Sequence, residues 1–159
     1  MKTRSFLTAF LLLAVLTSAA AAADYVTIAH PTSFRGIQWG TPFEDIPDLL
    51  PVKGAGYKAT YFKKNEKLTF GDAEILSVAY YFRKDRLYRV GVAFEGRANH
   101  FLLKERLLGT YGPGRGVGHR YGWMWRDFSV ELTYDDDNKT GALYYTFEGK
   151  LDQDSSETP

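Results

Sequence analysis

The chain has 159 residues, of which 45% are hydrophobic and 16% aromatic, and this length favours a single domain. Its 20 basic and 19 acidic side chains nearly cancel, which argues against a nucleic-acid binder or a polybasic membrane binder. The absence of cysteine excludes disulfides, cysteine nucleophiles, thiolate metal sites and lipid attachment through cysteine.

Residues 1–23 have the pattern of a secretory signal peptide. Lys2 and Arg4 precede an apolar run from Phe6 to Leu16, and a tract of small residues ends at Ala23. The apolar run is shorter than the roughly 20 residues that span a bilayer. We therefore expect cleavage near Ala23, a mature chain without a transmembrane segment, and a secreted or periplasmic location. An exported chain of this size without cysteine is more typical of the bacterial envelope, because an oxidising compartment would permit disulfides.

A helical segment is predicted at two places in the chain. Residues 41–44 (Thr-Pro-Phe-Glu) have a threonine cap, a proline at the first helical position and a glutamate at the third, and Pro47 should keep this helix short or kinked. The second helix begins near residues 97–99 and ends at Gly112-Pro113. Its apolar side chains share roughly one side: Leu103, Leu107, Leu108 and Tyr111.

Two strand hairpins follow these helical segments and resemble each other in sequence. Ser77-Val78 precedes Phe94-Glu95-Gly96 by the same spacing, within one residue, that separates Ser129-Val130 from Phe147-Glu148-Gly149. Polar turns at residues 83–86 and 135–141 divide each copy into two strands of period-2 alternation. The expected core faces are Val78, Tyr80, Phe82, Tyr88, Val90, Val92 and Phe94 in the first copy and Phe128, Val130, Leu132, Tyr134, Leu143, Tyr145 and Phe147 in the second.

Further strands are predicted at residues 57–63, 68–70 and 121–126, and residues 26–28 could add an edge strand. The order is helix and then three or more strands, twice, which predicts a single α+β domain over residues 24–149. Repeat 1 spans about 36–96 and repeat 2 about 97–149, and we expect one antiparallel sheet with the helices packed on one face. The polar tail, residues 150–159, is predicted to be disordered.

The aromatic residues provide the first candidate binding site. Alternation places Tyr81 and Tyr144 opposite the core residues of their own strands, and it puts Trp123 and Trp125 together on one face of another strand. With Arg89 nearby, these rings would form a charged aromatic surface on the open face of the sheet, suited to a protein, peptide or glycan. The alternatives are that the rings pack with one another, under a loop or across a dimer.

The run from Gly112 to Arg120 provides the second candidate site. Its alternate glycines, with Arg115, His119 and Arg120, could form a loop that binds or hydrolyses an anionic or sugar-containing compound. However, the run follows a helix, whereas phosphate loops precede a helix N-terminus. A plain helix-to-strand connection is the other interpretation.

No sequence motif indicates catalysis or a resident metal. The chain has no H-x-x-x-H pair and no G-x-S-x-G serine. Residues 135–138 (Asp-Asp-Asp-Asn) lack the EF-hand spacing, since Thr146 occupies the position of the bidentate glutamate, so a hairpin turn is the better interpretation. We therefore expect no cofactor, no metal and a protein that is not an enzyme.

Four segments carry a resemblance to known proteins: the G-I-x-W-G-T-P pattern at 36–42, the hairpin around Leu87-Tyr88, the helix end Tyr111-Gly112-Pro113 and the strand Tyr121–Trp125. They resemble a group of small, uncharacterised secreted proteins of Gram-negative bacteria. More distantly, the doubled helix-plus-strands plan is similar to the β-lactamase-inhibitor-protein fold and to outer-membrane assembly lipoproteins of the SmpA/OmlA type. The resemblance implies a protein or peptide partner in the envelope and binding rather than catalysis. The chain departs from those lipoproteins because it has no cysteine to acylate.

Overall fold

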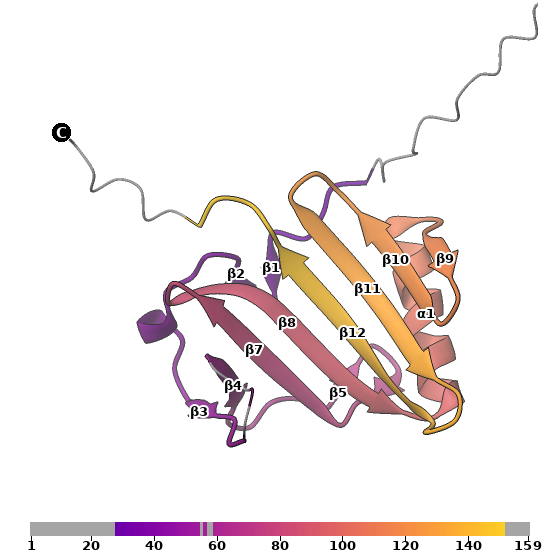
Figure 1. The fold of residues 1–159 in the computed structure, drawn as a ribbon, viewed down its shortest axis with the longest axis horizontal. Coiled ribbons are helices and arrows are strands. Elements are labelled where there is room, and N and C mark those ends of the chain that lie inside the picture. The colour runs from indigo at the N-terminus through magenta and orange to yellow at the C-terminus, as the bar shows by residue number, and fades with distance from the viewer. Residues whose placement is uncertain (1–27, 55, 57–58, 152–159) are drawn as a thin grey trace, which may run out of the picture.

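The computed structural model describes residues 28–54, 56 and 59–151, and its central element is an eight-stranded antiparallel sheet (Figure 1). The helical elements are the 3-10 turn η1 (Phe43–Asp45) and the helix α1 (Arg97–Tyr111). The strands are β1 (Ser33–Phe34), β2 (Ile37–Gln38), β3 (Leu49–Pro51), β4 (Thr60–Lys63), β5 (Thr69–Phe70), β6 (Ala73–Glu74), β7 (Ser77–Arg83), β8 (Arg86–Glu95), β9 (Arg115–Val117), β10 (Arg120–Met124), β11 (Phe128–Asp135) and β12 (Thr140–Phe147).

The strand order of the large sheet is symmetrical about its centre. The order is β3-β4-β7-β8-β12-β11-β10-β9, so the hairpin β7–β8 meets the hairpin β11–β12 through the pair β8 and β12. Both hairpins and their polar turns lie where the alternation predicts them. Of the predicted strand at 57–63, residues 60–63 form β4, whereas residues 57 and 58, and the predicted signal peptide at 1–23, lie outside the described residues.

One face of the sheet is covered, and the other is open. In Figure 1 α1 lies behind the β10 and β11 side of the sheet, and β1 and β5 lie on the same side. The covered face carries the core, where alternate residues of β7, β8, β11 and β12 are buried together with Leu103, Leu107 and Tyr111 of α1. The predicted apolar side of this helix is therefore confirmed, and Gly112, with φ of 75°, ends it as expected.

The predicted first helix is wrong, because residues 43–45 form only a 3-10 turn. The backbone here pairs with the start of β8: Gly40 N–H donates to Leu87 O at 2.8 Å, and Phe43 N–H donates to Asp85 O at 2.8 Å. The Thr41 hydroxyl, expected to cap the helix, donates instead to Gln38 O. Leu87 N–H also donates to Thr41 O at 3.0 Å, so β8 takes the carbonyl that would accept the first hydrogen bond of a helix capped by Thr41. The described residues contain one α-helix, so two helix-plus-strand units are not present in full.

A β-bulge changes the face of Tyr88. The register between β7 and β8 shifts at Tyr81/Phe82, so that Phe82 pairs with Leu87 whereas Tyr81 pairs with Arg89. Leu87, fully buried, takes the core position, and Tyr88 is left half-buried outside the core cluster. The prediction of Tyr88 as a core residue is therefore wrong, since strict alternation cannot anticipate the extra residue that a bulge inserts.

Candidate functional site

The candidate site lies at the centre of the open face, where three of the predicted binding residues meet. Tyr81 on β7 pairs with Arg89 on β8, and Tyr144 on β12 pairs with Gly91, two residues further along β8. Because residues two apart in a strand share a face, these side chains come from three adjacent strands onto the same surface. We term Tyr81, Arg89 and Tyr144 the open-face cluster.

Arg89 is held by rings rather than by carboxylates. Its guanidinium carbon lies 4.1 Å from the centre of the Tyr144 ring and 5.9 Å from that of Tyr81, which are cation–π distances. Its Nε atom is buried without a hydrogen-bond partner, and the ion pairs found among the described residues do not include Arg89. A buried donor without a partner costs roughly 1–3 kcal/mol, so an acceptor brought by a ligand would be stabilised here.

Small residues hollow out the surface beside the cluster. A pocket of about 380 Å³ has a floor of small residues and walls that include Phe62, Tyr81 and Tyr144. The floor consists of Ser77, Ala79, Gly91, Ala93 and Ala142. A Cβ atom on Gly91 would stand 2.8 Å from Cε1 of Tyr144 and 3.3 Å from Cε2 of Tyr81, so glycine is required for both rings to lie close over β8.

Trp123 and Trp125, the other two predicted binding residues, are not on the open face. Trp123 is 1% exposed, and its Nε1 donates to Gly112 O at 2.8 Å at the end of α1. Trp125 is half-buried, with its ring centre 5.3 Å from that of Tyr111. Both tryptophans pack against the helix on the covered face, so their placement in an open-face site is wrong. Alternation shows that they share a face, but the pairing of Trp123 with Val130 decides which face.

The predicted Gly112–Arg120 loop is mainly a β-hairpin. β9 and β10 pair through Val117 and Arg120, with a turn that includes Gly118 at φ of 58°. Arg115 lines a hollow on the open face, His119 lines a different one beside α1, and Arg120 lies 3.6 Å from Glu131. The hairpin therefore gives Arg115 and His119 no common cavity.

The acidic turn has the structural role that the sequence favours. The Asp135 carboxylate accepts hydrogen bonds from the backbone of Asp137 and Asn138, and these bonds lower the pKa of Asp135. Asp136 pairs with Arg97 at the start of α1. Among the described residues, no group of three or more histidines and carboxylates could hold a metal ion.

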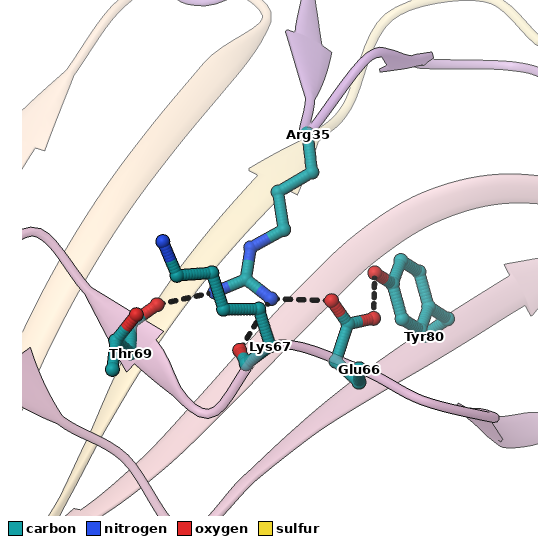
Figure 2. Close-up of polar contacts among 5 residues, drawn as sticks. All are labelled: Arg35, Glu66, Lys67, Thr69 and Tyr80. Atoms are coloured by element: carbon teal, nitrogen blue, oxygen red, sulfur yellow. Dashed lines mark hydrogen bonds and ion pairs between the residues drawn. The ribbon is translucent and has the colours of Figure 1, made fainter.

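The covered face has a polar network of its own (Figure 2). The Arg35 guanidinium pairs with Glu66 and also donates to Lys67 O at 2.8 Å and Thr69 O at 2.7 Å. The other carboxylate oxygen of Glu66 accepts the Tyr80 hydroxyl at 2.6 Å. Burial, together with this negative neighbour, raises the pKa of Tyr80. The network ties the turn after β1 to the loop before β5.

Two features of the open-face site escaped the sequence analysis. Phe62 was not predicted because its face depends on the pairing of β4 with β7, which joins distant segments. The hollow floor did leave a signal, since Ser77 and Ala79, like Gly91 and Ala93, are small residues at alternate positions opposite the core. This pattern indicates room above a sheet.

No protein-family model matches the chain, and neither the curated proteins nor the solved structures include a match to it. None of the helices in the described part of the chain is long and apolar enough to cross a membrane.

Proposed function

We propose that the protein is a non-enzymatic binding module that docks an acidic segment of a protein or peptide on its open sheet face. The observation that carries the proposal is Arg89, which stacks between Tyr81 and Tyr144 with its Nε atom buried and without a hydrogen-bond partner. A carboxylate side chain would give the guanidinium charge-assisted hydrogen bonds.

The surroundings of Arg89 favour an acidic ligand with apolar neighbours. Lys53 and Phe62 belong to the adjoining pocket, and none of its lining residues is acidic. Phe62 is 39% exposed and pairs across adjacent strands with Ala79 of the pocket floor. Aromatic side chains and arginine are the residues that most often dominate protein interfaces. An extended segment that alternates acidic and aliphatic side chains matches this surface.

A peptide titration tests the proposal. Decapeptides that alternate glutamate with aliphatic residues are titrated into the folded protein, and matched peptides carry glutamine in place of glutamate. We expect the wild type to bind the acidic peptides and the Arg89→Gln variant to bind them with at least tenfold lower affinity, since a charge-assisted hydrogen bond contributes about 1.5–3 kcal/mol. Arg126→Gln, at an exposed arginine between β10 and β11, is the control and should bind as the wild type does.

Three outcomes would contradict the proposal. They are equal binding of both peptide sets, unchanged binding by Arg89→Gln, and a homodimer that buries the open-face cluster. Light scattering on the wild type and on the Tyr144→Arg variant detects the last of these. If the cluster forms a dimer interface, the wild type has the mass of a dimer and the variant that of a monomer.

We further propose that binding occurs outside the cytoplasm, in a secreted or periplasmic form. The support is the sequence of residues 1–23 alone, with its basic start, apolar run and small-residue end. N-terminal sequencing of the exported chain tests this proposal, with Asp24 as the expected first residue. Export without cleavage, or retention in the cytoplasm, would contradict it.

We also propose that the two halves are copies of one unit, which is the plan that the resemblance to the β-lactamase-inhibitor-protein fold implies. The symmetrical strand order supports it, since β4, β7 and β8 mirror β10, β11 and β12 about the centre of the sheet. In this proposal η1 stands where the first copy has lost its helix. Related chains with a full helix before β4 would support the proposal, and relatives whose halves share no matching positions would contradict it.

A further inference from the structure

The covered face contains a second hollow, away from the open-face cluster. Its volume is about 430 Å³, and it lies among β1, the loop and turn around β5, the end of α1 and β12. Phe34 and Phe70 give it apolar walls, and Tyr111 and Tyr145 bring two hydroxyl groups. We term this hollow the covered-face pocket. It shares no residue with the pocket beside Arg89.

The charge of the covered-face pocket is positive. Arg35, Lys67 and Arg106 are among its lining residues, and none of the lining residues is acidic. Glu66 compensates Arg35, as Figure 2 shows, but the ion pairs found among the described residues include neither Lys67 nor Arg106. Two uncompensated cations at one hollow attract an anion.

Arg106 is positioned against the rim of the pocket. Its guanidinium carbon lies 5.7 Å from the centre of the Phe70 ring. A Cβ atom on Gly71 would stand 3.0 Å from both Cδ and Nη1 of Arg106, so the glycine leaves the space in which the side chain lies. The guanidinium is also close enough to Tyr111 and Tyr145 to oppose the rise in pKa that burial causes for each hydroxyl.

Two buried tyrosines line the pocket. Tyr145 is 4% exposed and Tyr111 is 7% exposed, and their hydroxyls are hydrogen-bonded to each other. Each tyrosine hydroxyl has one proton to donate and lone pairs to accept with, so the pair can offer a donor to an acceptor in the pocket. The tyrosine hydroxyl, a guanidinium and an ammonium group are then all donors to the same space.

We propose that the covered-face pocket binds a small organic anion, a carboxylate or a phosphate monoester on an aromatic or aliphatic body. The anionic group contacts Arg106, Lys67 and the Tyr111 hydroxyl, and the body packs against Phe34 and Phe70. The volume lies within the range of pockets for small molecules. This site is independent of the proposed peptide-binding face, so either proposal can fail alone.

Titrations with simple probes test the proposal. Benzoate and phenyl phosphate are added to the folded protein and followed by backbone amide NMR, with benzamide and benzyl alcohol as neutral counterparts. We expect at least one of the two anions to bind, and the neutral compounds to bind at least tenfold more weakly. The stronger of the two anions identifies the preferred headgroup.

Substitutions locate the binding. Arg106→Gln, at an exposed position on α1, should lower the affinity for the anion at least tenfold. Tyr111→Phe, which keeps the ring, should lower this affinity severalfold. Arg126→Gln is the matched control and should leave binding unchanged. The proposal is overturned if the neutral compounds bind as well as the anions, if Arg106→Gln binds as the wild type does, or if neither anion binds at millimolar concentration. Because Arg106 is outside the core, its variant decides the matter even if Tyr111→Phe fails to fold.

Discussion

Arg35 and Arg89 both lie over aromatic rings, on opposite sides of the sheet, yet within the described part of the chain acceptors are found for Arg35 and not for Arg89. The Arg35 guanidinium lies 5.4 Å from the Phe34 ring centre and reaches Glu66 and two backbone carbonyls. The Arg89 guanidinium has the rings of Tyr81 and Tyr144 and a buried Nε atom without a partner. The covered side therefore uses its arginine to connect parts of the fold, whereas the open side keeps donor capacity that a ligand can use.

Large-to-small substitutions on the two faces should separate these roles most clearly. Trp123→Ala on the covered face removes a ring that is 1% exposed, and we expect a loss of about 3–5 kcal/mol in the free energy of unfolding. Tyr144→Ala on the open face removes a half-buried ring and should cost less than about 2 kcal/mol. Urea unfolding at neutral pH measures both. Equal losses would mean that the open-face rings belong to the core and are not kept for a partner.

A glycine-to-alanine pair makes the same comparison with a single methyl group. At Gly141 a Cβ atom would stand 2.2 Å from Cζ of the buried Phe94 and 2.6 Å from Thr133 O, so neither neighbour can yield easily. We expect Gly141→Ala to cost about 1–3 kcal/mol. At Gly91 the new methyl meets the half-buried Tyr144 ring, which can swing outward, so the loss should be smaller.

The Gly91→Ala variant is tested by two measurements, its free energy of unfolding and its affinity for acidic peptides. Gly91→Ala displaces the rings of the open-face cluster. The variant should therefore lose more free energy of acidic-peptide binding than free energy of unfolding. Gly141→Ala, on the other face, should leave peptide affinity unchanged in the fraction that is folded. The reverse pattern would place the binding surface on the covered side.

The parts of this fold that depend on neighbouring residues could be predicted from the sequence. The two hairpins follow from alternation and polar turns, and α1 follows from its apolar side and from Gly112. The prediction of the first helix failed because the backbone of residues 40–43 forms hydrogen bonds with the start of β8. This tertiary pairing overrides the local sequence preference for a helix. Long-range pairing also decided the faces of Tyr88 and Trp123, and a single sequence does not contain that register.

The candidate site was predictable to the same extent. Tyr81, Arg89 and Tyr144 lie on strands whose core faces are clear, so their common surface follows from alternation. The pocket around Arg106 was not predictable, because it joins β1, the β5 region, α1 and β12, and only the folded chain brings these four segments together.

The smallest expected effect concerns Tyr80 on the covered face, and it appears at alkaline pH. Burial and the Glu66 carboxylate raise the pKa of Tyr80 in the folded protein, whereas the unfolded chain ionises near pH 10. The folded state then binds more protons, so stability falls as pH rises above about 10, by up to about 1.4 kcal/mol per pH unit for this group. At pH 7 Tyr80→Phe should cost about 1 kcal/mol for the lost hydrogen bond. Urea unfolding should show the difference in unfolding free energy between the wild type and Tyr80→Phe shrink and then reverse between about pH 10 and 11. A difference that stays constant over this range would mean that Tyr80 is open to solvent.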